Sequence, residues 1–409
     1  MLELDSNSHS PSASVKFCAV LPLSPPPTNW STINWYCKKI CGVPFLKRNI
    51  INIQRAGVDL LIIYSNSKNT ALYRKFYKEQ GISIKLIFES DITEVIKVSK
   101  DYSILILNSE ALYTKQEIEF SLNFKNQSNK AFVHPIDPKN FAEAITQVSL
   151  GNKTPVTQLS GDKNSRVNFL PGKSNTYINT PRDFFIKQKN LLQNSGLDND
   201  SFMDKTVTRF FSRKLTIFFL KTPLSPNMIT ILSLFIGLIS AIFFTQGTHQ
   251  NNMIGAALLL LSAWVDCTDG EVARLKFLES KIGGKLDIIC DNLVHFAVFF
   301  SIGIGLYQST GDNIFILLGS LAVFGSLISF LLLSSSIIDK KSVASIKKVY
   351  QEKKNTLTDN LANRDFIYFL FFMSLIGRVD IFLYITTFGS NIFAGYLIYS
   401  KIKLLLSKS

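Results

Sequence analysis

The second half of the chain is dominated by long apolar runs, whereas the first half mixes short apolar stretches with many polar residues. A helix needs roughly 20 apolar residues to cross a hydrocarbon layer about 30 Å thick. From residue 225 onward most of the runs reach that length, and the fifth is shorter. The pattern predicts an all-α bundle of six transmembrane helices within residues 223–405. The expected spans are 225–246, 252–273, 287–308, 313–337, 364–378 and 380–402.

Short apolar segments alternate with amphipathic stretches through the first 150 residues, a pattern typical of a parallel sheet covered by helices. The strand candidates are 15–21, 58–64, 82–88 and 102–108, and the helical stretches include 44–56, 71–80 and 138–150. We therefore expect an α/β domain with a mostly parallel sheet over 15–152. Residues 1–14 are polar and predict a disordered lead-in rather than a signal peptide. Residues 153–200 begin with a stretch rich in Asn, Ser, Lys and Gly, and predict a linker and a connecting helix.

Residues 201–222 combine aromatic and basic side chains directly before the first expected span. Phe210, Phe211 and Phe218 are interleaved with Arg209 and Lys214. Helices of this composition lie in the interface between the lipid headgroups and the hydrocarbon. The alternative is an ordinary amphipathic helix packed on the soluble domain. The position next to a span favours the membrane interface.

The chain carries a net charge of +14, and the placement of its basic residues indicates a membrane rather than a nucleic-acid partner. Lys and Arg gather in alternate loops, as expected where those loops face the cytoplasm. We therefore expect a multi-pass membrane protein with the N-terminal domain, the active site and the C-terminus in the cytoplasm. The basic groups are Arg209, Arg213, Lys214 and Lys221; Arg274, Lys276, Lys281 and Lys285; Lys340 to Lys354 with Arg364; and Lys401 with Lys403. The cysteines, Cys18, Cys37, Cys41, Cys267 and Cys290, lack zinc-type spacing, and the cytoplasm disfavours disulfides.

Four carboxylates lie at or inside the cytoplasmic ends of the second and third spans. A single Asp near the centre of a spanning helix costs about 2.5–3.5 kcal/mol, and less near the interface, so four together need compensation. The first two are spaced i, i+3 and the last two i, i+4, so each pair shares a helix face. A tight turn around Gly283 and Gly284 would bring the two helices side by side. The acids are Asp266, Asp269, Asp287 and Asp291.

An all-oxygen set of this kind suits Mg²⁺ or Mn²⁺, and calcium less clearly. Two such ions would bridge a pyrophosphate. Gly270 and Ala273 share the face of the first two acids and leave space for a nucleotide, and Arg274 offers a fork for phosphate oxygens. The alternative is that the acids pair with the nearby Arg and Lys side chains. His295, Cys267 and Cys290 are expected to serve packing.

The segment DCTDGEVARLKFLESKIGGKLDIICD matches the pattern D-x2-D-G-x2-A-R-x8-G-x3-D-x3-D and resembles the CDP-alcohol phosphotransferase family from about residue 204 to the C-terminus. The resemblance implies a membrane enzyme of phospholipid biosynthesis. It would transfer a substituted phosphate from a CDP-alcohol donor to an alcohol acceptor and release CMP. By the same resemblance, Asp266, Asp269 and Asp287 bind metal, and Asp291 is the general base with metal ligation as a second role. Gly270, Ala273, Arg274 and Gly283 would shape the CDP site.

Residues 42–66 resemble the post-loop helix and second strand of sugar-phosphate nucleotidyltransferases. The chain departs from that family where chemistry would occur. PLSPPPTNW replaces the Gly-rich loop, and its prolines remove the N–H donors that a triphosphate needs. Asn108 and Ser109 stand where a metal-binding Asp is expected. We therefore expect an inactive nucleotidyltransferase-like domain that takes part in partner binding or in assembly of a homodimer.

Two other functions compete with the transferase. The chain could be a non-catalytic scaffold with a relic site, or a transporter, because acids within the membrane also mark ion pathways. The acids gather at one side of the membrane rather than at its middle, which disfavours a transporter. By analogy with fused enzymes, the acceptor would be inositol phosphate or another polyol phosphate, and Arg364 or the Lys340–Lys354 group could receive its phosphate. For those basic residues, setting the topology is the alternative role.

Overall fold

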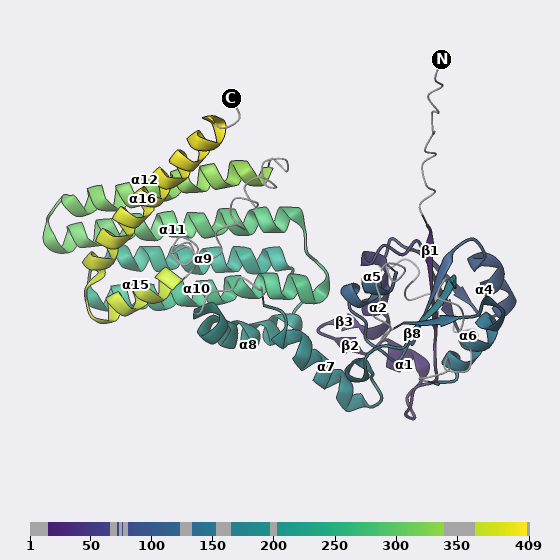
Figure 1. The fold of residues 1–409 in the computed structure, drawn as a ribbon. Coiled ribbons are helices and arrows are strands. Elements are labelled where there is room, and N and C mark those ends of the chain that lie inside the picture. The colour runs from purple at the N-terminus through teal and green to yellow at the C-terminus, as the bar shows by residue number, and fades with distance from the viewer. Residues whose placement is uncertain are drawn as a thin grey trace, which may run out of the picture. The chain divides into compact units, whose positions relative to one another are not determined.

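The computed structural model describes residues 15–65, 72, 76, 81–122, 133–152, 165–196, 203–338 and 365–406. The chain divides into two compact units, Met1–Leu191 and Leu192–Ser409, and each is described by itself (Figure 1). Three expectations fall mostly or wholly outside the described residues. They are the lead-in over 1–14, the helix over 71–80, and the basic residues 340–354 with Arg364.

The first unit is built on a six-stranded sheet in the order β5-β4-β1-β6-β8-β7. Neighbouring strands are parallel except β7 and β8, which are antiparallel. The central β1 buries Cys18 to Leu21 completely, as a strand covered on both faces must. The strands are β1 (Phe17–Pro22), β4 (Leu60–Tyr64), β5 (Lys85–Glu89), β6 (Ser103–Leu107), β7 (His134–Ile136) and β8 (Val167–Leu170), with a separate ribbon of β2 (Lys39–Ile40) and β3 (Val43–Pro44).

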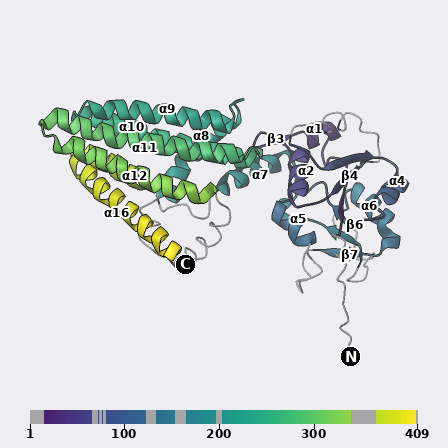
Figure 2. The ribbon, with the colours of Figure 1, turned by 90° about the horizontal axis from the view of Figure 1, so that it is seen from above.

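Helices cover both faces of this sheet, which confirms the expected mostly parallel α/β arrangement. Figures 1 and 2 show α2 and α5 on one side and α4 and α6 on the other. The apolar faces of α4 and α6 join the core through Val95, Phe141 and Ile145. The helices are α1 (Thr32–Tyr36), α2 (Phe45–Arg55), α4 (Ile92–Ser99), α5 (Lys115–Leu122), α6 (Phe141–Ser149) and α7 (Pro181–Gln193).

One part of the expected linker is wrong. Within 153–200, Val167–Leu170 forms β8, which pairs with β6 in the interior of the sheet. The alternation of Val167, Phe169 and Leu170 with polar Asn168 is too short to stand out in a polar segment. It becomes a strand because β6 and β7 offer it hydrogen-bonding edges on both sides.

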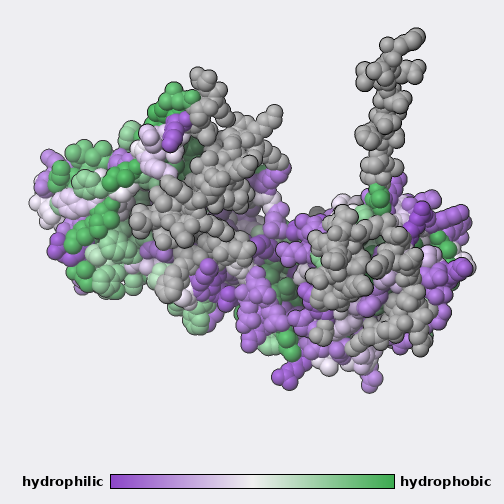
Figure 3. All heavy atoms as spheres, viewed as in Figure 1, coloured by the Kyte–Doolittle hydropathy of each residue, from purple (hydrophilic) through white to green (hydrophobic). Residues whose placement is uncertain are grey.

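The second unit is helical. It contains η4 (Asp204–Thr208), α8 (Arg209–Leu220), α9 (Pro226–Thr245), α10 (His249–Lys276), α11 (Lys281–Thr310), α12 (Ile314–Ile338), α15 (Asp365–Leu375) and α16 (Val379–Leu406). Large apolar side chains cover its outer faces, including Phe235 and Ile242 on α9 and Ile392 on α16 (Figure 3). A water-soluble protein rarely exposes so much apolar surface.

Five helices among the described residues are long and apolar enough to cross a membrane: α9, α10, α11, α12 and α16. α15 is apolar but has only 11 described residues. At 1.5 Å per residue this is about 16 Å, roughly half of the hydrocarbon thickness. The expected count of six is therefore approximate, with five full-length candidates and one short helix.

The helices approach closely where glycines face one another. A Cβ atom on Gly305 of α11 would lie 2.0 Å from the carbonyl oxygen of Phe244 at the end of α9. Where α11 meets α12, a Cβ on Gly303 would lie 2.7 Å from the carbonyl oxygen of Phe315. Small residues allow this close backbone packing, which is how helices in membranes gain van der Waals contact.

The turn between α10 and α11 lies earlier than the sequence predicts. It is centred on Phe277 to Ser280, whereas Gly283 and Gly284 lie in the first turn of α11. Phe277 adopts the left-handed conformation that ends α10, and the Ser280 hydroxyl caps α11 by accepting a hydrogen bond from the Gly283 amide at 2.9 Å. This serine cap starts the helix before the glycines, so they are not needed for the turn itself.

Candidate active site

α9 presents two hydroxyl side chains to the acidic segment of α10. The Ser225 hydroxyl caps α9, and Pro226 occupies its first turn. Thr230 and Ser233 then lie one turn apart on the buried face. The Thr230 hydroxyl donates to Asp269 Oδ2, and Ser233 Oγ lies 3.2 Å from Asp266 Oδ1. The carboxylates are thus held from the side of α9.

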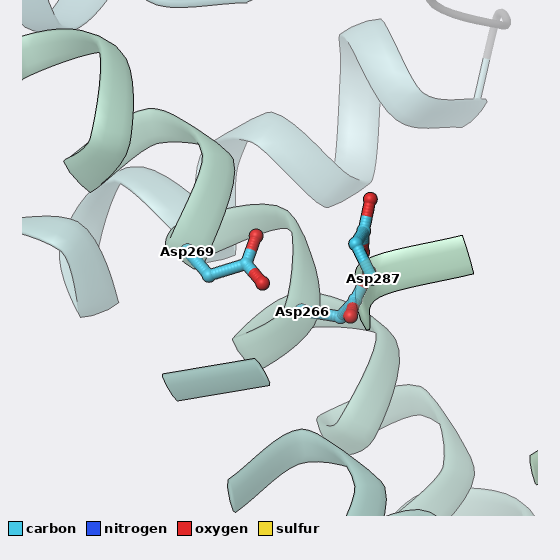
Figure 4. A group of neighbouring side chains, drawn as sticks. All are labelled: Asp266, Asp269 and Asp287. Carbon is cyan, nitrogen blue, oxygen red and sulfur yellow. The ribbon is translucent and has the colours of Figure 1, made fainter. Parts of the chain in front are cut away.

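Three of the four predicted acids come together. One oxygen each of Asp266, Asp269 and Asp287 lies within 4.8 Å of the others, and the side chains converge from α10 and α11 (Figure 4). Asp266 is 4% and Asp269 7% exposed. Opposite oxygens around an octahedral Mg²⁺ are about 4.2 Å apart at Mg–O distances of about 2.1 Å. The donor type and the spacing therefore fit a small divalent cation.

Asp291 lies one turn further along α11, and the group of three acids among the described residues does not include it. It instead lines a cavity together with Asp266, between α9, α10, α11 and α15. Ser233 and Ser262 add hydroxyls to this cavity, and Ile367 closes it from α15. Asp291 therefore faces a small space next to the three carboxylates, with room for about one water molecule.

The residues predicted to shape a nucleotide site lie at the same end of α10 and α11. Gly270 and Ala273 are half-buried, and a Cβ on Gly270 would lie 3.1 Å from an Nη atom of Arg274. Arg274 Nε donates to the Ser195 carbonyl oxygen at 2.9 Å. A Cβ on Gly283 would lie 2.9 Å from Asn227 Oδ1 on α9. Both glycines therefore keep room for polar side chains of their neighbours.

Sequence reasoning missed Glu271, which is fully buried two residues after Asp269 on α10. Its Oε1 accepts from Arg209 Nη1 at 2.7 Å and from Ser212 Oγ at 2.8 Å, and its Oε2 accepts from Thr216 Oγ1 at 2.6 Å. All three donors belong to α8. The sequence does contain a signal that could have found this contact. Arg209, Ser212 and Thr216 are spaced i, i+3 and i+7, which places them on one face of α8.

His295 packs against aromatic rings and also lines the cavity that Asp291 lines. The His295 ring lies 5.0 Å from the ring of Phe366 and 6.2 Å from that of Phe299, measured between centroids. Cys290 is buried at the cavity wall, whereas Cys267 is half-buried. The ring contacts of His295 fit a packing role, and a packing role for the two cysteines stays a prediction.

The sheet unit has its own polar cluster, where β1 and β6 end. In open α/β sheets, ligands bind at the carboxyl ends of strands on either side of a topological switch point, and here that point lies between β1 and β6. Ser24 Oγ donates to Glu110 Oε1 at 3.1 Å, and Tyr36 OH lies 2.9 Å from Ser109 Oγ. Burial raises the pKa of Tyr36 to about 12, so its hydroxyl stays a donor, to the Ser24 carbonyl oxygen. Protein side chains thus hydrogen-bond to one another at this edge.

The family comparison matches a segment that lies within the helical unit. Residues 223–389 match the family model for CDP-alcohol phosphatidyltransferases. A bifunctional IPC transferase and DIPP synthase of Aquifex aeolicus is 28% identical over 134 residues, which are 32% of this chain and 30% of that protein. An archaetidylinositol phosphate synthase of Pyrococcus horikoshii is 33% identical over 82 residues, covering 20% of this chain and 42% of that protein. Both matches thus span less than half of the relative.

A longer match reaches the sheet unit. A bifunctional IPC transferase and DIPP synthase of Thermococcus kodakarensis is 22% identical over 340 residues, covering 70% of this chain and 75% of that protein. Because 70% of the chain is more than the whole of Leu192–Ser409, the similarity extends beyond the helical unit.

Proposed function

We propose that the chain, whose residues 223–389 match the family model for CDP-alcohol phosphatidyltransferases, transfers a substituted phosphate group from a CDP-alcohol to an alcohol acceptor and releases CMP. The observation that carries this proposal is the convergence of Asp266, Asp269 and Asp287 within the matched segment. We also propose the domain organisation expected from the sequence: an α/β domain, a connecting segment, an interfacial helix and a membrane-spanning transferase domain.

The three carboxylates would hold Mg²⁺ or Mn²⁺, in one or two ions. Bound there, a divalent cation neutralises charge on a pyrophosphate and on the departing phosphate. The chain's own contribution is to orient the carboxylates: Thr230 holds Asp269, and Ser233 lies beside Asp266. Because the site is largely buried, few water molecules compete with the ligand oxygens for the ion.

Asp291 is the proposed general base. From the cavity it would accept the proton of the acceptor hydroxyl, whose oxygen then forms a bond to the β-phosphorus of the donor. The bond between that phosphorus and the bridging oxygen breaks, and its electrons leave with CMP. Asp291 and Asp266 line the same small cavity, so an acceptor hydroxyl that reaches Asp291 would lie beside the bound diphosphate.

Gly270, Ala273, Arg274 and Gly283 would form the CDP site. The absence of a side chain at Gly270 leaves the Arg274 guanidinium close to the α10 backbone. Arg274 would then turn its Nη atoms to phosphate oxygens, while its Nε keeps the Ser195 carbonyl.

The proposed setting is a membrane with the active site at its cytoplasmic surface. α10 has 28 residues and is about 42 Å long, so one end must leave a hydrocarbon layer of about 30 Å. The acids lie within the last three turns of α10, next to Arg274 and Lys276. α8 would lie in the headgroup region, because it exposes Phe210 and Phe218 while burying polar residues. A homodimer stays a prediction.

The proposed acceptor is inositol phosphate or another polyol phosphate. The archaetidylinositol phosphate synthase and the bifunctional relatives support this choice through their names and their similarity to this chain. We propose that the sheet domain is a nucleotidyltransferase-like fold without activity, because hydroxyl and carboxylate side chains fill the edge where a nucleotide would bind.

The test is CMP release by the full-length chain in lipid nanodiscs. The reaction contains CDP-diacylglycerol, inositol phosphate or another polyol phosphate, and Mg²⁺ or Mn²⁺. We expect CMP and a new lipid to form together, to stop in excess EDTA, and to be lost in Asp269→Asn. A well-folded chain that releases no CMP with any acceptor would favour the scaffold. Metal-dependent ion uptake into vesicles without CMP release would favour the transporter.

A further inference from the structure

The fully buried Glu271 lies outside the group of three carboxylates. A helix turns about 100° per residue, so Glu271 points about 200° away from Asp269, which is two residues earlier. It therefore lies on the opposite side of α10 and faces α8 rather than the proposed metal ion. A buried carboxylate needs compensation, and here the neighbouring helix supplies it.

The compensation comes from one face of α8. Arg209, Ser212 and Thr216 are spaced i, i+3 and i+7, and all three donate to Glu271 at 2.6 to 2.8 Å. Arg209 is only 5% exposed, so the two charges of the pair are buried together. Both carboxylate oxygens have donors, which restricts the rotation of the carboxylate as well as its position.

The other contacts between the two helices constrain their relative position less. Phe211 stacks on Trp264 with ring centroids 4.0 Å apart and an 8° angle between the planes. Phe219 joins an apolar cluster with Val265 and Val272. Apolar contacts are non-directional, so they hold the helices together without setting how far one slides along the other. One further hydrogen bond, from Thr268 Oγ1 to the Ser212 carbonyl oxygen, is long at 3.4 Å, so the three shorter bonds to Glu271 contribute most to that register.

We propose that Glu271 is a positioning residue, which holds Asp266 and Asp269 in the geometry for metal binding by locking α10 onto α8. The inference rests on the proposed function, since it assumes the metal site. Glu271 touches neither reactant nor metal. It acts through the backbone of α10, and productive sites tolerate displacements of only about 0.5 Å.

The test separates positioning from stability with a double variant. Arg209→Met combined with Glu271→Met removes both buried charges at once, and such replacements often leave stability unchanged or raise it. The variant keeps Asp266, Asp269 and Asp287. We expect near-normal thermal stability but a Mn²⁺ requirement for CMP release raised by roughly tenfold or more. Mn²⁺ binding followed by electron paramagnetic resonance in nanodiscs should weaken in parallel.

Arg209→Lys supplies a second readout, because it retains the buried charge pair and changes only the geometry of the donors. We expect a smaller rise in the Mn²⁺ requirement with the melting temperature preserved. Asp380→Asn is the matched control: it breaks the exposed Arg378–Asp380 pair of the same unit and should leave Mn²⁺ binding unchanged.

Wild-type Mn²⁺ binding in the double variant, with stability preserved, would overturn the inference and leave Glu271 a structural residue. The inference also fails if the double variant unfolds while Arg209→Lys binds Mn²⁺ like the wild type. Failure of the proposed function shows differently, as a wild-type chain that binds no Mn²⁺ or releases no CMP.

Discussion

Asp287 and Asp291 are one turn apart on α11, yet the structure places them in different surroundings. Asp287 joins Asp266 and Asp269 in the group that fits a cation, whereas Asp291 lines the adjoining cavity. A base must reach the acceptor hydroxyl, and a ligand must reach the ion. The separation of these places is the structural support for giving the two acids different roles.

Asp291→Asn tests this division. We expect turnover to fall by about 100-fold or more while the affinity for the CDP-donor changes little, because a base acts in the transition state. Asp266→Asn should weaken donor and metal binding together. Binding of radiolabelled CDP-diacylglycerol, measured beside single-turnover CMP release in nanodiscs, compares the two. Equal loss of donor affinity in both variants would make Asp291 chiefly a metal ligand.

Thr230 provides a second residue-level prediction. Its buried hydroxyl donates to Asp269 Oδ2, so Thr230→Val removes the hydrogen bond with little change in shape. We expect the Mn²⁺ concentration for half-maximal CMP release to rise by about 10–100-fold. Thr230→Ser keeps the hydroxyl and should restore most of the affinity. If valine and serine behave alike, the hydroxyl does not orient Asp269.

At the level of elements, glycine contacts set how closely α9 and α11 can approach. Gly305→Ala would place a Cβ atom 2.0 Å from the Phe244 carbonyl oxygen, so the backbones must separate. We expect a loss of about 1–3 kcal/mol or more, seen as a lower melting temperature in detergent. Gly395→Ala on α16 is the control, since its Cβ would meet no atom within 4 Å. An unchanged melting temperature for Gly305→Ala would show that this close contact is not required.

The short connection from α10 to α11 matters because it joins the two pairs of acids. α10 ends at Lys276 and α11 begins at Lys281, so Asp269 and Asp287 come from two consecutive helices that both pack against α9. Phe277 in the left-handed conformation and the Ser280 cap define this turn. The acids meet because the end of α10 and the start of α11, which carry them, lie at the same end of the bundle on either side of this short turn.

At the level of the whole molecule, the sheet unit is expected to add no nucleotidyltransferase activity. Ser24 and Ser109 bond to each other and to Tyr36 and Glu110, and the Asn108 amide bonds to the Tyr113 hydroxyl oxygen. We predict that the full chain releases no pyrophosphate from CTP, Mg²⁺ and inositol phosphate. Asp269→Asn serves as the control, because pyrophosphate that persists in it would come from the sheet unit. Such release would show that this unit is an active enzyme.

Much of the fold was readable from local pattern. The apolar runs predicted the long helices, and the alternating segments predicted β1, β4, β5 and β6, because helix length and strand burial follow from nearby residues. β8 was missed because a strand of four residues depends on its partners, β6 and β7. The count of six spans stays approximate, because α15, at the place of the fifth expected span, is apolar but has only 11 described residues.

The acids of the site were also predictable, since i, i+3 and i, i+4 spacing decides which side chains share a helix face. The sequence by itself therefore determined the helices, the two pairs of acids and the oxygen donors that these acids offer to a cation. Only the tertiary structure decided that Asp287 rather than Asp291 completes the group of three, and that Glu271 bonds to α8. The reason is physical: spacing along one helix sets a face, but which faces meet depends on how α8, α9, α10 and α11 pack.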